Sequence, residues 1–362
     1  MQITNITIAD FRNYQRQSVE FCPFVNLITG QNAQGKTNLL EALYLTAIGK
    51  SARTNKDKEL IRWEQDKAKI SVEALKSYGT DKVDIVLDKS ANKKISVNNL
   101  PISKMGELMG IVRVVFFSPD EMKIVKESPS DRRRFMDIAL CQMSRNYFYL
   151  LQKYNRVVSQ RNKLIKSGQA NEDNLYVWDM QLVDAGARII KTRKGFILAL
   201  SEAGEKEHAS LTDKEKLSLE YESIKGDSIE EIKDMFLEEL RRGRERDLRL
   251  GYTNSGPHKD DFGIFIDGVD ARKFASQGQQ RTAALSLKLA EVALSVDRGE
   301  SPVLLLDDVM GELDLTRQHK LLTRIKGMQA VITCTHLDGG VISALGEHKK
   351  FVVENGKVEI AQ

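Results

Sequence analysis

Hydrophobic and polar positions follow two periods along this chain, and their order predicts an α/β protein. Residues 3–11 alternate as a strand does, and the apolar run 24–30 ends in glycine, which predicts a strand followed by a turn. Residues 38–48 repeat apolar side chains every three or four positions, so a helix is expected directly after that turn. Further strands are expected at 69–75, 82–87, 93–97 and 111–117.

The middle of the chain has a helical pattern, and its last third returns to strands alternating with helices. We expect two long helices at 130–166 and 174–208 and a third at 228–242. The runs 302–308 and 330–336 are apolar almost throughout, as buried parallel strands are. The predicted organisation is a discontinuous α/β domain, 1–125 plus 250–362, with a mainly helical lobe, 126–249, inserted between. The helices lack the successive heptads of a long coiled coil.

Composition narrows the class of protein. With 41% hydrophobic and 29% charged residues the chain is typical of soluble globular proteins, and no apolar run approaches the ~20 residues of a membrane span. The first residues are polar where a signal peptide is basic and then apolar, so a cytoplasmic location is expected. Cys22, Cys141 and Cys334 lie far apart without metal-type or disulfide-type spacing, which favours reduced thiols.

The net charge of +4 is small, but it is unevenly spread. Residues 122–166 contain 11 Lys and Arg against three acids, whereas 202–240 contain 13 acids against five Lys, and five arginines follow within 241–249. Charged helical surfaces explain such blocks in part, yet blocks of opposite sign also indicate a polarised surface that suits a polyanion. The aromatic residues of 144–163 recur with aliphatic ones at helical spacing, so we interpret them as packing inside the helical lobe rather than as a base-stacking surface.

The segment "GQNAQGKT", Gly30 to Thr37, fits the P-loop pattern G-x-x-x-x-G-K-[ST] between a predicted strand and a predicted helix. Its glycines let successive backbone N–H groups turn inward around phosphates, Lys36 reaches the β and γ oxygens, and Thr37 offers a hydroxyl to Mg²⁺. We therefore expect ATP and Mg²⁺ as ligands. The residues expected to contact the nucleotide here are Gly30, Gln31, Asn32, Ala33, Gln34, Gly35, Lys36, Thr37 and Asn38.

Two adjacent carboxylates end the apolar run "VLLLDD". Because like charges repel at a strand end, a cation and a water molecule are the natural reason for the pair. We assign Asp307 to magnesium, and Asp308 to orienting or deprotonating the attacking water, which makes Asp308 and Lys36 the predicted catalytic residues.

The stretch "SQGQQR", 276–281, stands at the expected start of a helix without an acid or a lysine among its first residues. The Ser276 hydroxyl and the Gly278 and Gln279 amides would form an anion site at the positive end of that helix. Since the P-loop already wraps one nucleotide, a second phosphate site is expected to complete the nucleotide that another copy of the chain holds.

These motifs resemble the signature, Walker B and D-loop ("GELD", 311–314) of ATP-binding-cassette ATPases. A fuller set resembles the RecF family of bacterial recombination and repair ATPases: "DFRNY" (10–14), "GKSART" (49–54), "FFSPDEM" (116–122), "PSDRRRFMD" (129–137), "GPHKDDF" (256–262) and "SQGQQR". Gly311 and Gln277 depart from the usual D-loop and signature residues. The resemblance covers residues 10 to about 336.

What the resemblance implies is an ABC-type head like those of SMC proteins, without long coiled-coil arms. It also implies an ATP-dependent homodimer, slow DNA-stimulated hydrolysis, binding to duplex and gapped DNA in the nucleoid during the response to DNA damage, and work with RecR and RecO in loading RecA. By the same resemblance Arg12 and Arg53 would lie near the nucleotide, and Asp120 or Glu121 near magnesium. His336 would contact the γ-phosphate, although a local structural role explains a histidine after a strand equally well.

Two other functions fit the P-loop. The motor subunit of a membrane transporter usually has its signature much closer to the P-loop than the 238 residues (38–275) that intervene here, and it has no need of "DRRRF". An SMC-like structural tether would need heptad arms. Stimulation of ATP turnover by duplex DNA separates the first alternative from a DNA-dependent ATPase.

Overall fold

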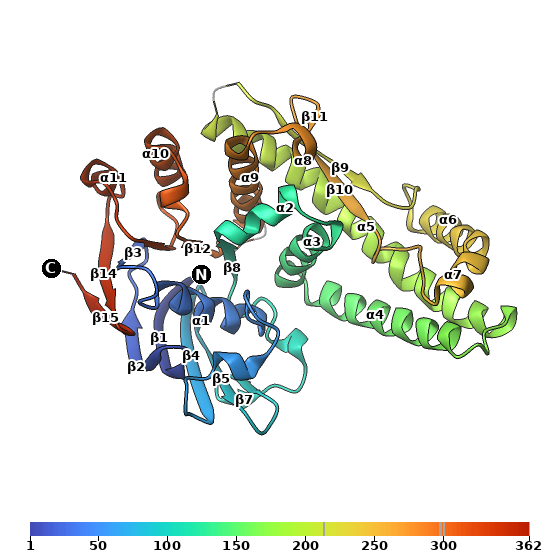
Figure 1. Ribbon diagram of the computed structural model, residues 1–362, viewed down its shortest axis with the longest axis horizontal. Helices are drawn as coiled ribbons and strands as arrows, with labels where there is room; N and C mark the ends of the chain where they lie inside the picture. The colour runs from blue at the N-terminus through green and yellow to red at the C-terminus, as the bar shows by residue number, and fades with distance from the viewer. Residues whose placement is uncertain (213, 297–298, 300, 362) are drawn as a thin grey trace. The chain divides into compact units, whose positions relative to one another are not determined.

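The computed structural model describes residues 1–212, 214–296, 299 and 301–361 (Figure 1). The chain divides into two compact units. The first contains 1–122, 207–214 and 284–362, and the second contains 123–206 and 215–283. Within the described residues, no helix combines the length and apolar character needed to cross a membrane.

The core of the first unit is a largely parallel sheet of order β15-β14-β3-β13-β12-β8. Its strands are β3 (Val25–Thr29), β8 (Val114–Phe117), β12 (Val303–Asp307), β13 (Ala330–Cys334), β14 (His348–Glu354) and the antiparallel edge strand β15 (Lys357–Ile360). Strands β8, β12 and β13 are buried along their whole length, so the prediction of buried parallel strands at 302–308 and 330–336 is confirmed.

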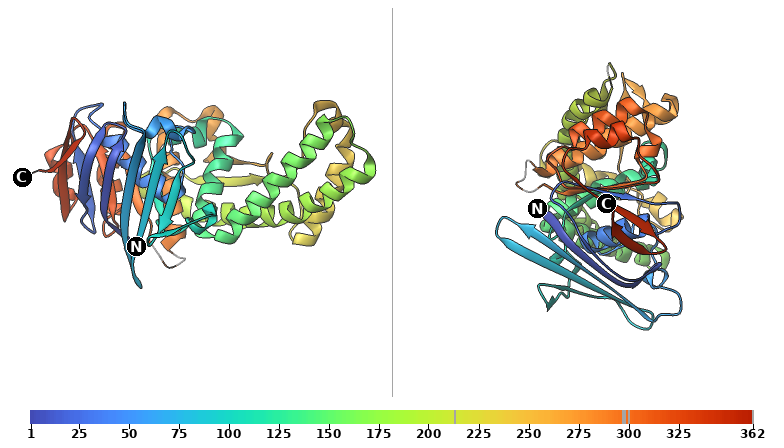
Figure 2. Two further views of the ribbon diagram at one scale, coloured as in Figure 1. Left: turned by 90° about the horizontal axis from the view of Figure 1, so that it is seen from below. Right: turned by 90° about the vertical axis from the view of Figure 1, so that its left-hand side faces the viewer.

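A second sheet in this unit is antiparallel, with the order β2-β1-β4-β5-β6-β7, and its long strands lie side by side in Figure 2. Its strands are β1 (Gln2–Phe11), β2 (Tyr14–Glu20), β4 (Lys67–Lys76), β5 (Gly79–Asp88), β6 (Lys94–Val97) and β7 (Leu100–Pro101). Helix α1 (Lys36–Ile48) contacts strands of both sheets. Because it is covered on two sides, its residues from Leu39 to Ala47 are all buried.

Short helices complete the first unit. They are α10 (Leu315–Arg324), α11 (Gly339–Ala344) and the 3₁₀ turns η1 (Asp57–Leu60), η2 (Met105–Glu107), η3 (Pro119–Met122) and η4 (Met310–Glu312).

The second unit is built on helices, and it holds α2 (Lys123–Lys126), α3 (Pro129–Met143), α4 (Arg145–Lys166), most of α5 (Glu172–Leu211), α6 (Ile229–Arg242) and α7 (Arg244–Leu250). The helix predicted at 130–166 is two helices. Ser144 has extended backbone angles and its Oγ accepts a hydrogen bond from the Tyr147 N–H, so it ends α3 and caps α4.

The unit boundaries differ from those predicted at 126–249. Strand β10 (Asp261–Ile266) pairs with β9 (Leu217–Glu222) and β11 (Val269–Asp270), and this sheet keeps 250–283, including α8 (Ala271–Phe274), with the helical unit. Helix α9 (Gln277–Val296) begins in the second unit and continues in the first. The end of α5 belongs to the first unit, where Glu207 pairs with Arg324 and His208 Nδ1 lies 2.9 Å from Ser286 Oγ.

Candidate nucleotide-binding site

The P-loop connects β3 to α1 in a backbone conformation that needs glycine at two points. Gly30 has φ of +154° and Gly35 has φ of +123°. A Cβ on Gly30 would collide with the Val353 carbonyl, and one on Gly35 would lie 2.8 Å from the Asn13 side chain. The loop is therefore clamped between β14 and the turn after β1, and its two glycines are structural requirements.

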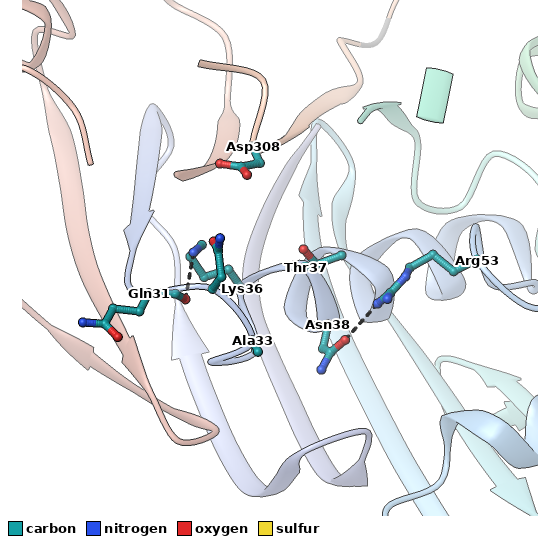
Figure 3. A pocket seen from close by; sticks show the side chains of 9 residues that line it. Gln31, Ala33, Lys36, Thr37, Asn38, Arg53 and Asp308 are labelled. Carbon is teal, nitrogen blue, oxygen red and sulfur yellow. Dashed lines mark hydrogen bonds between the residues drawn. The ribbon is translucent and has the colours of Figure 1, made fainter. Parts of the chain in front are cut away.

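A cavity of about 410 Å³ lies over this loop. Its lining residues are Gln31, Asn32, Ala33, Gly35, Lys36, Thr37, Asn38, Arg53 and Asp308 (Figure 3). Lys36 Nζ donates to the carbonyls of Gly30 at 2.5 Å and Gln31 at 3.0 Å, which holds the ammonium group over the loop. The P-loop residues and Asp308, separated by about 270 positions in sequence, thus share one cavity.

Thr37 and Asp307 are paired beside this cavity. Thr37 Oγ1 donates to Asp307 Oδ1 at 2.9 Å, and Thr333 Oγ1 donates to the same oxygen at 2.7 Å. Burial raises the pKa of Asp307 above its usual value, although both hydroxyls favour the charged form. A hydroxyl and a buried carboxylate side by side are ligands that Mg²⁺ accepts when phosphate oxygens and water supply the rest of its shell.

Asp308 has a φ of +54°, which is uncommon for a residue with a side chain. Its N–H donates to the Thr333 carbonyl at 3.1 Å and lies 3.0 Å from Thr333 Oγ1, so β13 holds the strained backbone. Asp307 and Asp308 consequently differ: the first is buried against two hydroxyls and the second faces the cavity. Thr333 was not among the predicted site residues, because a threonine inside an apolar strand has no distinguishing pattern in the sequence.

A buried carboxylate, Glu41 of α1, organises the arginines near the site. Arg12 makes a two-point contact with it, with both N–O distances 2.9 Å, and Ser51 Oγ donates to it at 2.5 Å. Arg53 Nη1 lies 3.8 Å from Glu41 and donates to Asn38 Oδ1 at 3.1 Å. Glu41 and Ser51 were not among the predicted residues, because a buried acid in an apolar helix resembles any other helix acid in sequence.

Arg12 lines a second cavity of about 430 Å³ instead of the first. The two cavities share Asn38 and Arg53. Trp63 is on the rim of the second one with 89% of its surface exposed. An exposed indole beside a phosphate-binding loop provides a flat face against which a base can stack.

Other predicted residues lie outside the lining of the P-loop cavity. His336 is exposed two positions beyond the end of β13. Asp120 and Glu121 follow β8, whose neighbour in the sheet is β12. Glu121 is paired with the buried Lys288 at 3.1 Å. Burial alone lowers the pKa of Lys288, but the carboxylates of Glu121 and Glu291 raise it above its usual value.

The signature stretch forms a capping box at the start of α9. Gln279 N–H donates to Ser276 Oγ at 3.2 Å, and Ser276 N–H donates to Gln279 Oε1 at 2.9 Å. Ser276 is exposed. Because the hydroxyl accepts the Gln279 N–H, its own proton is left to donate, and the Gly278 N–H belongs to the first turn, where a helix offers no carbonyl partner.

Two of the three arginines in "DRRRF" are structural. Arg132 makes a two-point contact with Asp261 at 2.6 and 2.7 Å, and Arg133 donates to the Asp260 carbonyl at 2.7 Å. Arg134 is exposed. The two motifs "PSDRRRFMD" and "GPHKDDF" therefore contact each other, and Asp261 neutralises the charge of Arg132.

Among the described residues, no cluster of three or more His, Cys, Asp or Glu side chains could hold a metal ion by itself. The residues that fit Mg²⁺ are Thr37 and Asp307, and they do so together with the phosphates of a nucleotide. The arrangement has the parts of a phosphoryl-transfer site: a phosphate cradle, a cation, an Mg²⁺-type oxygen pair and a carboxylate facing the cavity.

The chain is similar to proteins of known family. The family described as RecF/RecN/SMC N terminal domain matches residues 2–356. A DNA replication and repair protein RecF of Clostridium perfringens is 43% identical over 362 residues, which cover 99% of this chain and 100% of that protein. A protein of the same name from Agathobacter rectalis is 44% identical over 365 residues, 99% of each chain.

The chain is also similar to solved structures. The recombination mediator protein RecF with ATP, of the RecFOR pathway, matches with a TM-score of 0.92 at 36% identity, covering 100% of this chain and 98% of that chain. An Smc head bound to the C-winged helix domain of ScpA matches with a TM-score of 0.60 at 14% identity, covering 100% and 97%. At 14% identity the likeness concerns the fold alone.

Proposed function

Because the chain belongs to the RecF family of DNA replication and repair proteins, we propose that it is an ATP-dependent DNA-binding protein of recombinational repair and replication-gap processing. The fold predicted from sequence, an ABC-type head like those of SMC proteins without long coiled-coil arms, is confirmed by these matches. The transporter and tether alternatives have no comparable support.

The observation that carries the proposal is the shared cavity of Lys36, Thr37 and Asp308. Lys36 and the loop amides bind the β and γ phosphates of ATP, and Thr37 and Asp307 would hold Mg²⁺, which would supply positive charge to the phosphates. Asp308 orients a water molecule toward the γ-phosphorus and accepts its proton as the bond to ADP breaks. The second cavity, with Arg12 and Trp63, receives the base.

The active form is an ATP-driven homodimer on duplex DNA near junctions with single strands. Ser276 and Gly278 of one copy donate to the γ-phosphate that is bound at the P-loop of the other. The solved RecF structure that matches this chain belongs to the RecFOR pathway, and for this chain RecR, RecO and RecA are the corresponding partners. Hydrolysis is slow and is stimulated by DNA.

Phosphate release measured with and without blunt duplex DNA tests the proposal, with Asp308→Asn as the control for contaminating ATPases. Turnover should rise with DNA and be lost in Asp308→Asn. A rate that duplex DNA leaves unchanged would favour a transporter-type motor over a DNA-dependent ATPase.

A further inference from the structure

Helix α4 differs in charge from the other long helices of the second unit. Its 22 residues include no Asp or Glu, whereas α3, α5 and α6 all carry acids. Six of its residues are basic: Arg145, Lys153, Arg156, Arg161, Lys163 and Lys166. A surface helix of this length normally mixes both signs of charge, so the lack of acids calls for a partner of negative charge.

The burial of α4 separates its apolar residues from its cations. Tyr147, Tyr154, Val157 and Ile165 are buried on one face, together with Arg161. The opposite face, here named the outer face of α4, exposes or half-exposes residues at spacings of three and four: Arg145, Tyr149, Gln152, Arg156, Gln160 and Lys163. Every one of these side chains carries an N–H or O–H donor, and Lys166 follows at the end of the helix.

Carboxylates of neighbouring elements neutralise only part of this charge. Arg161 turns inward, where it pairs with Asp179 and Asp247 at 2.7 Å each. Lys153 lies 3.8 Å from Asp184 of α5. Within the part of the chain that the structure describes, no carboxylate pairs with Arg156, Lys163 or Lys166. The outer face therefore keeps a row of cations directed at solvent.

The dimensions and donors of this face fit the backbone of a duplex. A helix of 22 residues is about 33 Å long, close to the ~34 Å of one turn of B-DNA. Of its four aromatic side chains, Tyr149 alone is exposed, at 38%, so the face has no row of rings on which the bases of a single strand could stack. Lysine, arginine and glutamine spaced along one row suit phosphate oxygens of any sequence.

We propose that the outer face of α4 is a docking surface for the sugar-phosphate backbone of a DNA duplex. The proposal rests on the DNA binding proposed above and assigns it to particular side chains. Binding through this face is independent of base sequence, because phosphate contacts carry no sequence information. With about 4–6 phosphates neutralised by the whole protein, the logarithm of affinity should fall against the logarithm of salt concentration with a slope of roughly −4 to −5.

The test compares two triple variants of the full chain by fluorescence anisotropy with a blunt duplex at several salt concentrations. The first is Arg156→Gln, Lys163→Gln, Lys166→Gln. The matched control is Lys206→Gln, Lys214→Gln, Lys225→Gln, which removes the same charge from exposed lysines within the acidic segment 202–240. Each lost phosphate contact should make the slope less steep by about one, so the first variant should lose about three.

Several results distinguish the proposal from its alternatives. The control, and a variant that exchanges Arg and Lys at the same three positions, should keep the original slope, and ATP affinity should be unchanged in all of them. A slope unaltered by the first variant would overturn the assignment to α4 and leave DNA binding in place. If the unaltered protein bound no duplex at low salt, the proposed function would fail as well. If instead the variant abolished DNA-free self-association in light scattering, the face would be a contact with the acidic segment of a second copy.

Discussion

Lys36 and Asp308 line one cavity with opposite charges, and we propose a different task for each of them. Replacing Lys36 by Ala removes the cation that the loop holds over the phosphates. Since a hydrogen bond to a charged group contributes about 1.5–3 kcal/mol, ATP affinity should fall about tenfold or more. Asp308→Asn should bind ATP normally and hydrolyse it poorly. Isothermal titration and phosphate release measure the two effects, and equal losses of ATP affinity in both variants would contradict this division.

Trp63 should report the base of a bound nucleotide. It is one of two tryptophans, and the other, Trp178, belongs to the second unit and lines neither cavity. ATP should quench the intrinsic fluorescence, whereas inorganic tripolyphosphate, which has no base, should not. Trp63→Ala should abolish the signal and weaken ATP binding by about 1 kcal/mol or more, as loss of base stacking does. A change of equal size in Trp63→Ala would place the responding indole elsewhere.

At the scale of elements, burial and local pattern decided which features were predictable. Strands β3, β12 and β13 are short apolar runs, and they were predicted. The break at Ser144 was missed because the apolar pattern continues across it, and β9 was missed because its alternation is short and weakly apolar.

In the candidate site, too, only residues that belong to a recognisable motif could be predicted from the sequence. Lys36, Thr37, Asp307 and Asp308 were predicted because motif spacing identifies them. The structural role of Arg132 could not be predicted from the sequence. Its partner, Asp261, is 129 positions away, and the sequence does not show which arginine pairs with which carboxylate. The motif "PSDRRRFMD" was among those that indicated the family. The contact between Arg132 and Asp261, which explains the motif, is visible only in the structure.

Two residues of the motif "GPHKDDF", His258 and Asp260, should make the stability of the protein depend on pH in the acid range. Burial lowers the pKa of His258 to about 4, so its contribution to stability is complete above its ordinary value of 6.5 and is lost as pH falls toward 4. Burial raises the pKa of Asp260 to about 6, so its contribution is complete below 3.8 and is lost as pH rises to 6. Between pH 4 and 6 the two changes oppose each other.

Asp260→Asn removes one side of this balance. The variant should lose more stability than the unaltered protein when the pH is lowered from 6 to 4, by an amount on the order of 1–3 kcal/mol. Urea unfolding at pH 6, 5 and 4 measures the difference. Parallel stability curves for the two proteins would show that Asp260 is ionised throughout this range.

At the scale of the whole molecule, the signature and the P-loop are predicted to meet only between two copies. Ser276→Arg should bind ATP through its own P-loop, yet it should fail to dimerise, because the long cation replaces the hydroxyl that we propose to bind phosphate. Lys36→Ala is defective for a different reason. A mixture contains heterodimers that pair the intact P-loop of the first variant with the intact signature of the second.

ATP-dependent crosslinking of differently tagged chains should therefore recover in the mixture, and each variant alone should show little. Phosphate release should recover in part if one complete site suffices. If Ser276→Arg alone dimerised with ATP as the unaltered protein does, the capping box at 276–279 would be only a helix start and the composite site would be refuted.

The sheet order β15-β14-β3-β13-β12-β8 also determines when the sheet can form during synthesis of the chain. Strand β3, made within the first 29 residues, hydrogen-bonds to β13 and β14, which are made after residue 329. Loop closure over so long a separation is slow, and the apolar β3 and α1 must wait unpaired through most of translation at ~5–20 residues per second. A nascent or prematurely terminated chain therefore lacks a formed P-loop. Such a fragment exposes apolar strands to chaperones and proteases, and it cannot take up nucleotide.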